Sequence, residues 1–146
     1  MVDRRTVLQV AGVAGLGLAA LPGCGREDQA NPSAPPATPD DQQSDELALI
    51  AAYDAAIANA GTSRAAQYQR IRDEHAAHLH ALGWDDVTAA QPSTDAVKRN
   101  DLIVAERRAI RLRTQAARTT DDSDLAQILA LIAASEAQHL VSLEAT

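Results

Sequence analysis

Apolar residues recur at spacings of three and four along four stretches of the 146-residue chain. This period is that of an amphipathic helix, and no segment alternates convincingly with the period of two that is typical of a strand. Turn-forming residues such as Gly61, Gly83 and Pro92 separate the stretches. The pattern predicts an all-α protein, a four-helix bundle. Its helices are expected over about 44–60, 62–83, 94–119 and 125–146.

Each predicted helix carries at least one ionisable side chain on its apolar stripe. An unpaired buried charge costs several kcal/mol. A single such residue would have no significance, but one on every inner face predicts a shared polar cluster. The members with candidate chemistry are Glu46 on the first helix, His75 and His78 on the second, Glu106 and Arg113 on the third, and Glu136 and His139 on the fourth.

The heights of these groups along the bundle also agree. Glu46 and His75 lie about equally far from the turn near residue 61, and Glu106 and Glu136 about equally far from the turn near 121. If the second and third helices run parallel, His75 and Glu106 reach the same layer; if they run antiparallel, the two are offset by about 6 Å at 1.5 Å per residue. The parallel arrangement is therefore favoured, and it requires a long crossover between helices 2 and 3.

Composition and charge narrow the class of protein. The chain is 46% hydrophobic, has no Phe, and has only one Trp and two Tyr. An Ala-rich, aromatic-poor chain favours close-packed helices over a sheet. The formal net charge of −7 argues against a nucleic-acid partner, because binding to phosphates requires a basic surface.

The N-terminus predicts export. A short basic segment, MVDRR, precedes the weakly apolar TVLQVAGVAGLGLAA and the sequence LPGC, in which Cys24 is the only cysteine. This order is typical of a signal peptide over 1–23 rather than of a spanning helix. LPGC resembles a bacterial lipobox, which implies that Cys24 is lipidated, and the pair Arg4–Arg5 resembles a twin-arginine signal. Export by the twin-arginine or the general secretory route is left open.

A linker is expected to follow the predicted lipid anchor. Residues 24–43 are rich in Pro, Ala, Ser, Asp and Gln and show no apolar period, a composition typical of disorder. The expected organisation is therefore a signal peptide over 1–23, a disordered linker over 24–43 and a helical bundle over 44–146. No intramolecular disulfide is possible with a single cysteine.

Bundle-core carboxylates together with Glu-x-x-His on a helix are typical of ferritin-like di-metal proteins. The predicted bundle resembles that superfamily throughout, and most closely the uncharacterised ferritin-like domain of actinobacterial exported lipoproteins. Glu46 followed by Tyr53 resembles the family's first-helix ligand and its companion tyrosine. RDEHAAHLHAL resembles its second-helix segment, with His75 at the ligand histidine. Glu106 resembles its third-helix carboxylate, and Glu136 to His139 form an intact Glu-x-x-His.

One position departs from the family pattern. Arg72 stands three residues before His75, where the family has a metal-bridging glutamate. A guanidinium cannot ligate a metal and does not lose its charge. Two interpretations follow. In one, Glu46, His75, His78, Glu106, Glu136 and His139 hold one or two transition-metal ions, with Tyr53 and Arg72 beside them. In the other, Arg72 lies inside the bundle in place of a metal, and the cluster is a metal-free hydrogen-bond network.

Two functional hypotheses result. The first is a lipoprotein anchored to the outer face of the cell membrane that binds iron, manganese or zinc and has a redox or metal-handling role, such as peroxide handling. The second is a metal-free helical-bundle envelope lipoprotein that acts as a binding or scaffold module. The membrane, through the lipid anchor, is the expected partner of both, and the sequence leaves open a protein partner, a homodimer and whether the protein is an enzyme.

Overall fold

The computed structural model describes residues 38–90 and 96–145, and within them it has four long helices, one 3₁₀ turn and no strand. The prediction of an all-α four-helix bundle is confirmed at this level. The predicted signal peptide, Cys24 and most of the predicted linker lie outside the described residues. The elements are α1 (Pro39–Ala58), α2 (Thr62–Ala81), η1 (Val87–Ala89), α3 (Arg99–Thr119) and α4 (Ser123–Glu144).

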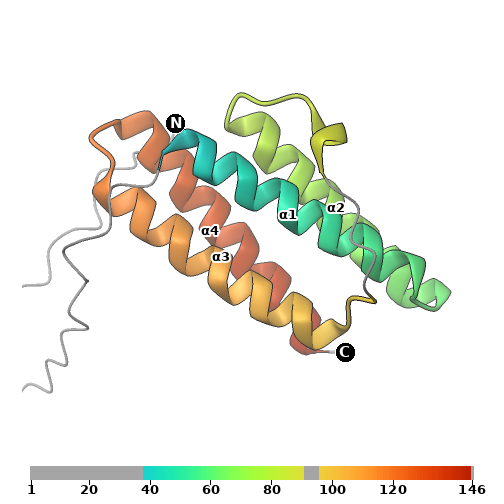
Figure 1. Ribbon diagram of the computed structural model, residues 1–146. Coiled ribbons are helices and arrows are strands. Elements are labelled where there is room, and N and C mark those ends of the chain that lie inside the picture. The colour runs from blue at the N-terminus through green and yellow to red at the C-terminus, as the bar shows by residue number, and fades with distance from the viewer. Residues whose placement is uncertain (1–37, 91–95, 146) are drawn as a thin grey trace, which may run out of the picture. The chain divides into compact units, whose positions relative to one another are not determined.

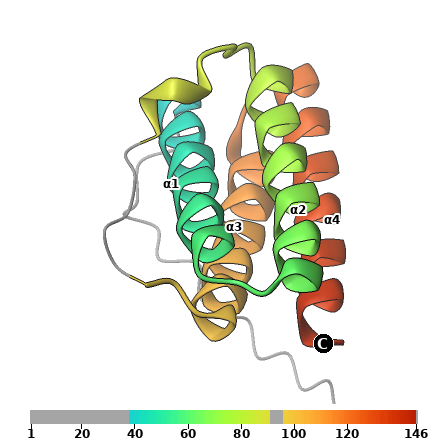
Figure 2. The same ribbon diagram turned by 90° about the vertical axis from the view of Figure 1, so that its right-hand side faces the viewer.

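The four helices form two hairpins that pack on each other. α1 packs on α2 and α3 on α4, and the contacts of α1 with α3 and of α2 with α4 join the hairpins (Figures 1 and 2). In Figure 1, α2 and α3 run in one direction, and α1 and α4 run in the other. Facing helices from different hairpins are therefore antiparallel, while α2 and α3 run parallel.

An apolar core cluster occupies one end of this arrangement. Its residues come from the second half of α1 and α4 and the first half of α2 and α3, as the helix directions require. Tyr53 and Tyr68 meet edge to face, with their ring centroids 6.0 Å apart. Further buried apolar residues, among them Leu79, Ala116 and Leu129, lie toward the other end of the bundle. The buried members of the cluster are Tyr53, Ala56, Tyr68, Ile71, Leu102 and Leu143.

The first helix begins earlier than the sequence pattern predicted. Thr38, and not Ser44, is the N-cap, and the last five residues of the predicted linker, 39–43, are helical. The cause is a capping box: the backbone N–H of Thr38 donates to Asp41 at 2.8 Å, and the backbone N–H of Asp41 donates to the Thr38 hydroxyl at 3.3 Å. The extension brings Gln42, which is 2% exposed, into the bundle interior.

The third helix begins later than predicted, at Arg99 rather than near Thr94. The backbone N–H of Lys98 donates to Asp101 at 2.9 Å and closes the first turn. Its buried stripe also differs by one position from the predicted stripe, which placed Ile103, Ile110 and Ala117 inside. Those three are only partly buried. The residues that face inward are Leu102, Glu106, Ala109, Arg113 and Ala116.

α4 is the one helix in the described part of the chain that is long and apolar enough to cross a membrane by length and composition alone. Core helices of soluble bundles meet the same criterion. Its stripe from Leu129 through Glu136 to Leu143 is buried against the other helices. α4 therefore buries one face in the bundle, while Leu131 and Val141 on its other side are exposed.

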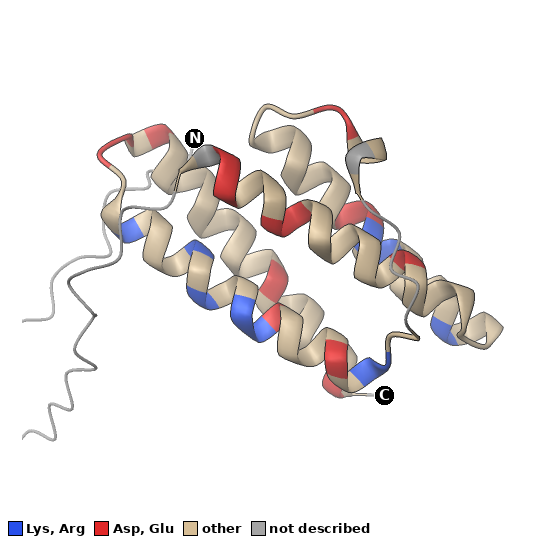
Figure 3. Ribbon diagram, in the orientation of Figure 1, with Lys and Arg blue, Asp and Glu red and all other residues tan. Residues whose placement is uncertain are grey.

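Charged side chains are unevenly distributed among the helices. Figure 3 shows arginines along α3, and those at 107, 108, 111 and 118 are exposed. Arg107 pairs with Glu144 at 2.6 Å and Arg108 with Asp45 at 3.8 Å. Exposed pairs of this kind contribute about 0–1 kcal/mol each, so this face does not determine how the helices pack.

The early start of α1 leads to a stability prediction. Thr38→Ala removes the capping oxygen and should lower the free energy of unfolding by about 1 kcal/mol. Ser44→Ala is the matched control: Ser44 lies in the exposed interior of α1, where alanine is the better helix former, so stability should stay equal or rise slightly. Urea unfolding followed by circular dichroism measures both. A larger loss in Ser44→Ala would contradict the observed helix start.

Candidate metal centre

The six predicted ligand residues converge at the middle of the bundle. They form two groups in which one potential ligand atom per residue lies within 4.8 Å of those of the others. His75 belongs to both groups. Whether the six bind metal stays a prediction, but their convergence from four helices is a feature of the fold. One group consists of Glu46, His75, His78 and Glu136, and the other of His75, Glu106 and His139.

His75 is the hub of the cluster. Its Nδ1 lies 2.9 Å from Glu46 Oε2 on α1, and its Nε2 lies 3.0 Å from Glu106 Oε1 on α3. All three side chains are fully buried. The Tyr53 hydroxyl donates to the same Glu106 oxygen at 2.5 Å. The expected equal heights of Glu46, His75 and Glu106 are therefore observed, and Tyr53 lies beside them.

His139 enters the cluster from α4 and connects it to the surface. Its Nδ1 lies 3.3 Å from Glu106 Oε1, and its Nε2 lies 2.7 Å from Glu74 Oε2. Glu74 is 55% exposed and lies beside the buried stripe of α2, on the side that faces α4. A carboxylate on the outer nitrogen of a histidine selects the tautomer in which the inner nitrogen carries the lone pair.

His78 completes the histidine set one turn after His75. Its Nδ1 lies 3.7 Å from Glu46 Oε1, beyond hydrogen-bonding distance. Its ring stacks on His139, with centroids 5.9 Å apart and an interplanar angle of 20°, and meets the His75 ring edge to face at 5.4 Å. Three imidazoles therefore lie in mutual contact.

Arg113 is the fixed cation of the cluster. Its side chain is completely buried, although it is the largest of the buried side chains. Its Nη1 donates to Gln42 Oε1 at 2.6 Å, and its Nη2 donates to Glu46 Oε1 at 3.1 Å. Its Nε lies 3.7 Å from Glu136 Oε1. The guanidinium thus joins α3 to α1 and faces the carboxylate of α4.

Arg72 is not in the cluster, so the expectation that it lies beside the ligands or replaces a metal is wrong. Its guanidinium pairs with Asp54 at 3.1 Å and lies 3.7 Å from Asp73, and its side chain is 21% exposed. Arg72 lies at the edge of the α2 stripe, where its long side chain reaches water and an acidic partner on α1. The buried guanidinium anticipated there is supplied by Arg113.

Burial and neighbouring charges give the acidic groups unequal pKa values. Burial disfavours the charged form of Glu46, but interactions with His75, His78 and Arg113 outweigh it and hold its pKa well below the usual range. Burial likewise opposes ionisation of Glu106, yet His139 and His75 lower its pKa to about 2. Glu136 differs, because burial dominates over Arg113 and, with the charge of Glu46, raises its pKa to about 8.

The pKa values of His75 and Tyr53 are both raised. Burial alone would lower the pKa of His75, but the carboxylates of Glu106 and Glu46 at its two ring nitrogens raise it to about 9. Burial, and then the charge of Glu106, raise the pKa of Tyr53 above its usual range. These shifts favour the charged forms of His75, Glu46 and Glu106 and the neutral form of Glu136.

Several buried polar atoms in the described region lack a hydrogen-bond partner, and all belong to the cluster. Leaving such an atom unpaired costs about 1–3 kcal/mol, so native proteins normally satisfy it with a protein group, water or an ion. These atoms are concentrated in one place, where water or an ion could be their partner. The atoms are His78 Nδ1, Glu106 Oε2, Arg113 Nε, both carboxylate oxygens of Glu136, and His139 Nδ1.

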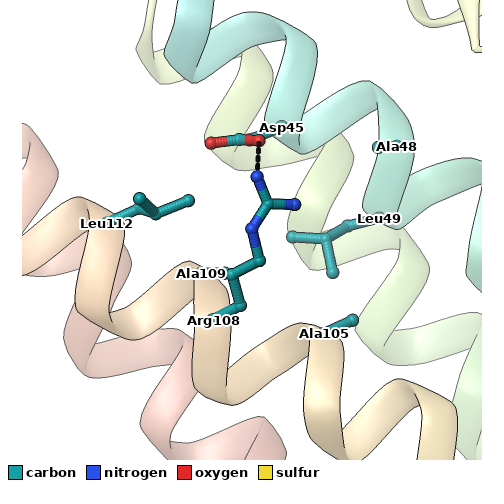
Figure 4. A pocket seen from close by; sticks show the side chains of 7 residues that line it. All are labelled: Asp45, Ala48, Leu49, Ala105, Arg108, Ala109 and Leu112. Carbon is teal, nitrogen blue, oxygen red and sulfur yellow. Dashed lines mark ion pairs between the residues drawn. The ribbon is translucent and has the colours of Figure 1, made fainter. Parts of the chain in front are cut away.

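A surface pocket between α1 and α3 is separate from these ligands (Figure 4). Arg108 extends across it toward Asp45, and the other lining side chains are apolar. Asp45 also lies 3.6 Å from Arg113, so one carboxylate touches both the pocket and the buried cation. None of the candidate ligands lines the pocket. Its residues are Asp45, Ala48, Leu49, Ala105, Arg108, Ala109 and Leu112.

Two contributors to the cluster were not found from the sequence. Gln42 fell within the predicted linker, and the signal that could have revealed it was Thr38 followed three residues later by Asp41. Glu74 is exposed and off the apolar stripe, so periodicity excluded it. Its position next to His75 was the only indication that it could reach a neighbouring helix.

Comparison with protein-family models, with curated proteins and with solved structures finds no match for this chain. The resemblance to the ferritin-like superfamily therefore stays a prediction from the sequence.

The contrast between the two arginines can be tested on metal-free protein. Arg113→Met leaves Glu46 without its buried cation and should lower the free energy of unfolding by about 3–5 kcal/mol. Arg72→Met is the matched control: it removes a partly exposed pair and should cost about 1 kcal/mol or less. Chemical unfolding in the presence of a chelator measures both changes, and equal losses would argue against Arg113 as the structural cation.

Proposed function

We propose that this protein binds a transition-metal ion at the centre of a four-helix bundle and has a redox or metal-handling role outside the cytoplasm. The observation that carries the proposal is the convergence of three carboxylates and three imidazoles from four helices, with unpaired oxygen and nitrogen atoms among them. These atoms fit a cation, since carboxylate oxygen and neutral imidazole nitrogen are metal ligands.

The donor set restricts the class of ion. The cluster has no sulfur ligand, which disfavours ions that prefer thiolate. Imidazole combined with carboxylate suits iron, manganese or zinc, and these three are the proposed candidates. A bound ion would supply Lewis acidity, or electron transfer if it is iron or manganese. The buried Tyr53 hydroxyl would orient Glu106 through its hydrogen bond.

A ferritin-like relationship is part of the proposal. It is supported by the Glu-x-x-His of Glu136 and His139 on α4, by the buried carboxylates of α1 and α3, and by the parallel course of α2 and α3 in Figure 1. A long crossover between α2 and α3 is part of the proposal. The chain departs from a full di-metal site on α2, which supplies His75 and His78 but no buried glutamate.

A second candidate function is favoured by Arg113. Its contacts with Gln42 and Glu46 support a bundle whose helices are aligned without a metal. In that case the protein would act through its surface as a binding or scaffold module in the cell envelope. A chelator would then leave its melting temperature unchanged.

Metal retention separates these two functions. Full-length protein purified anaerobically from cells supplied with iron, manganese and zinc should retain transition metal, and His139→Ala should lose it because a buried ligand is removed. His80→Ala is the matched control: His80 is exposed, pairs with Asp85 outside the cluster and should retain the metal. Elemental analysis gives the result. Absence of metal from the unaltered protein, or equal loss in the control, would reject the metal function.

We also propose that Cys24, outside the described residues, carries a lipid that anchors the protein to the outer face of the cell membrane. The support is the sequence LPGC after an apolar segment with a basic start. Cys24→Ala should move the protein from the membrane fraction to the soluble fraction, because the lipid attachment atom is lost. Fractionation followed by immunoblotting measures this, and unchanged membrane association would contradict the anchor.

A further inference from the structure

The two ligand groups are not equivalent. They share His75, and they compete for it. A neutral imidazole has one nitrogen with a lone pair, and the other nitrogen carries a proton. His75 can therefore ligate one ion in its neutral form. Because Nδ1 faces Glu46 and Nε2 faces Glu106, the choice of nitrogen decides which group receives the ion.

The second difference is the position of Arg113. Its guanidinium donates to Glu46 and faces Glu136, two members of the four-residue group. Within the described residues, Arg113 makes no hydrogen bond or ion pair with His75, Glu106 or His139. A guanidinium keeps its charge under all ordinary conditions. The four-residue group thus already has a cation at its carboxylates, and a metal ion there would be repelled by it.

The third difference is the support behind the histidines of the other group. Glu46 lies on Nδ1 of His75, and Glu74 lies on Nε2 of His139. Both carboxylates can accept an N–H, which leaves Nε2 of His75 and Nδ1 of His139 as the lone-pair nitrogens facing Glu106. Carboxylate-backed histidines of this kind are typical metal ligands. Glu106 also has one carboxylate oxygen, Oε2, without a partner.

We infer that the bundle holds a single divalent metal ion, bound by His75, Glu106 and His139, and that the Arg113 guanidinium takes the place of a second cation beside Glu46 and Glu136. This inference rests on the proposed metal-binding function. Two histidines and one carboxylate form the ligand set that holds ferrous iron with open positions in non-haem proteins. Glu46 and Glu74 are then positioning residues for the two histidines.

Stoichiometry and ligand variants test the inference on the full-length chain. Metal-stripped protein titrated anaerobically with Fe²⁺ should bind one ion per chain. Glu106→Gln and His139→Gln should abolish this binding, whereas His78→Gln and Glu136→Gln should retain one ion. Circular dichroism of each variant verifies the fold. No binding by the unaltered chain would reject the proposed function itself. Two ions per chain, or loss of the ion in His78→Gln or Glu136→Gln, would overturn only the inference.

Glu74 offers a test of the positioning role. Glu74→Gln replaces the carboxylate with a weaker acceptor and should reduce Fe²⁺ affinity by about 10- to 100-fold, with the melting temperature of the metal-free protein unchanged. Asp73→Asn is the matched control, because Asp73 is exposed on the same turn and contacts Gln69 and Arg72 instead. Equal affinities in the two variants would show that Glu74 does not orient His139.

Removal of the fixed cation tests the other half of the inference. Arg113→Met should bind a second Fe²⁺ per chain, at Glu46, His78 and Glu136, and Arg113→Lys should still bind one because the positive charge remains. A folded Arg113→Met variant that binds only one ion would overturn the role given to Arg113. If Arg113→Met does not fold, the two single variants Arg113→Lys and Glu136→Gln decide instead. Binding of two Fe²⁺ ions by either variant would be incompatible with a cation that already occupies the place of the second ion.

Discussion

The ion pair between Arg113 and Glu46 is the interaction on which the polar centre of the bundle depends. Both side chains are fully buried, and the guanidinium keeps its charge, so loss of either group removes a charged partner from the other. The pair joins α1 to α3, one of the two helix contacts between the hairpins. Gln42 reaches the same guanidinium only because the capping box at Thr38 extends α1 by several residues. A local turn signal therefore contributes to the central charge balance.

Tyr53 links the two regions of the interior. Its ring belongs to the apolar cluster at one end of the bundle, while its hydroxyl donates to Glu106 in the polar centre. Since Glu106 also lies against His75 and His139, one carboxylate receives groups from the three other helices. Small shifts of any helix would separate these partners. The apolar end thus stabilises the bundle, and the polar centre specifies how its helices align.

The sequence allowed the fold and the six converging residues to be predicted, because both follow from helical periodicity. The stripe of α4, with Glu136 and His139 in place of leucines, was an unambiguous signal. Arg72 was misplaced because family spacing was applied to it, although the period had already put Arg113 on an inner face. Glu74 could not be predicted, since its contact with His139 depends on the separation of α2 and α4, a tertiary property that periodicity does not describe.

The unpaired atoms bear on whether the cluster is a metal site or only a structural network. A network that only aligned the helices would be complete with Arg113, Glu46 and His75, because their hydrogen bonds already join three helices. The remaining groups add cost to such a network, because both oxygens of Glu136, one of Glu106 and the inner nitrogen of His139 have no partner. With Glu136 neutral and the outer nitrogen of His139 bonded to Glu74, the unpaired Glu106 oxygen and the inner nitrogen of His139 are electron-pair donors. A cation bound by these two atoms would satisfy both of them, which supports the proposed metal function.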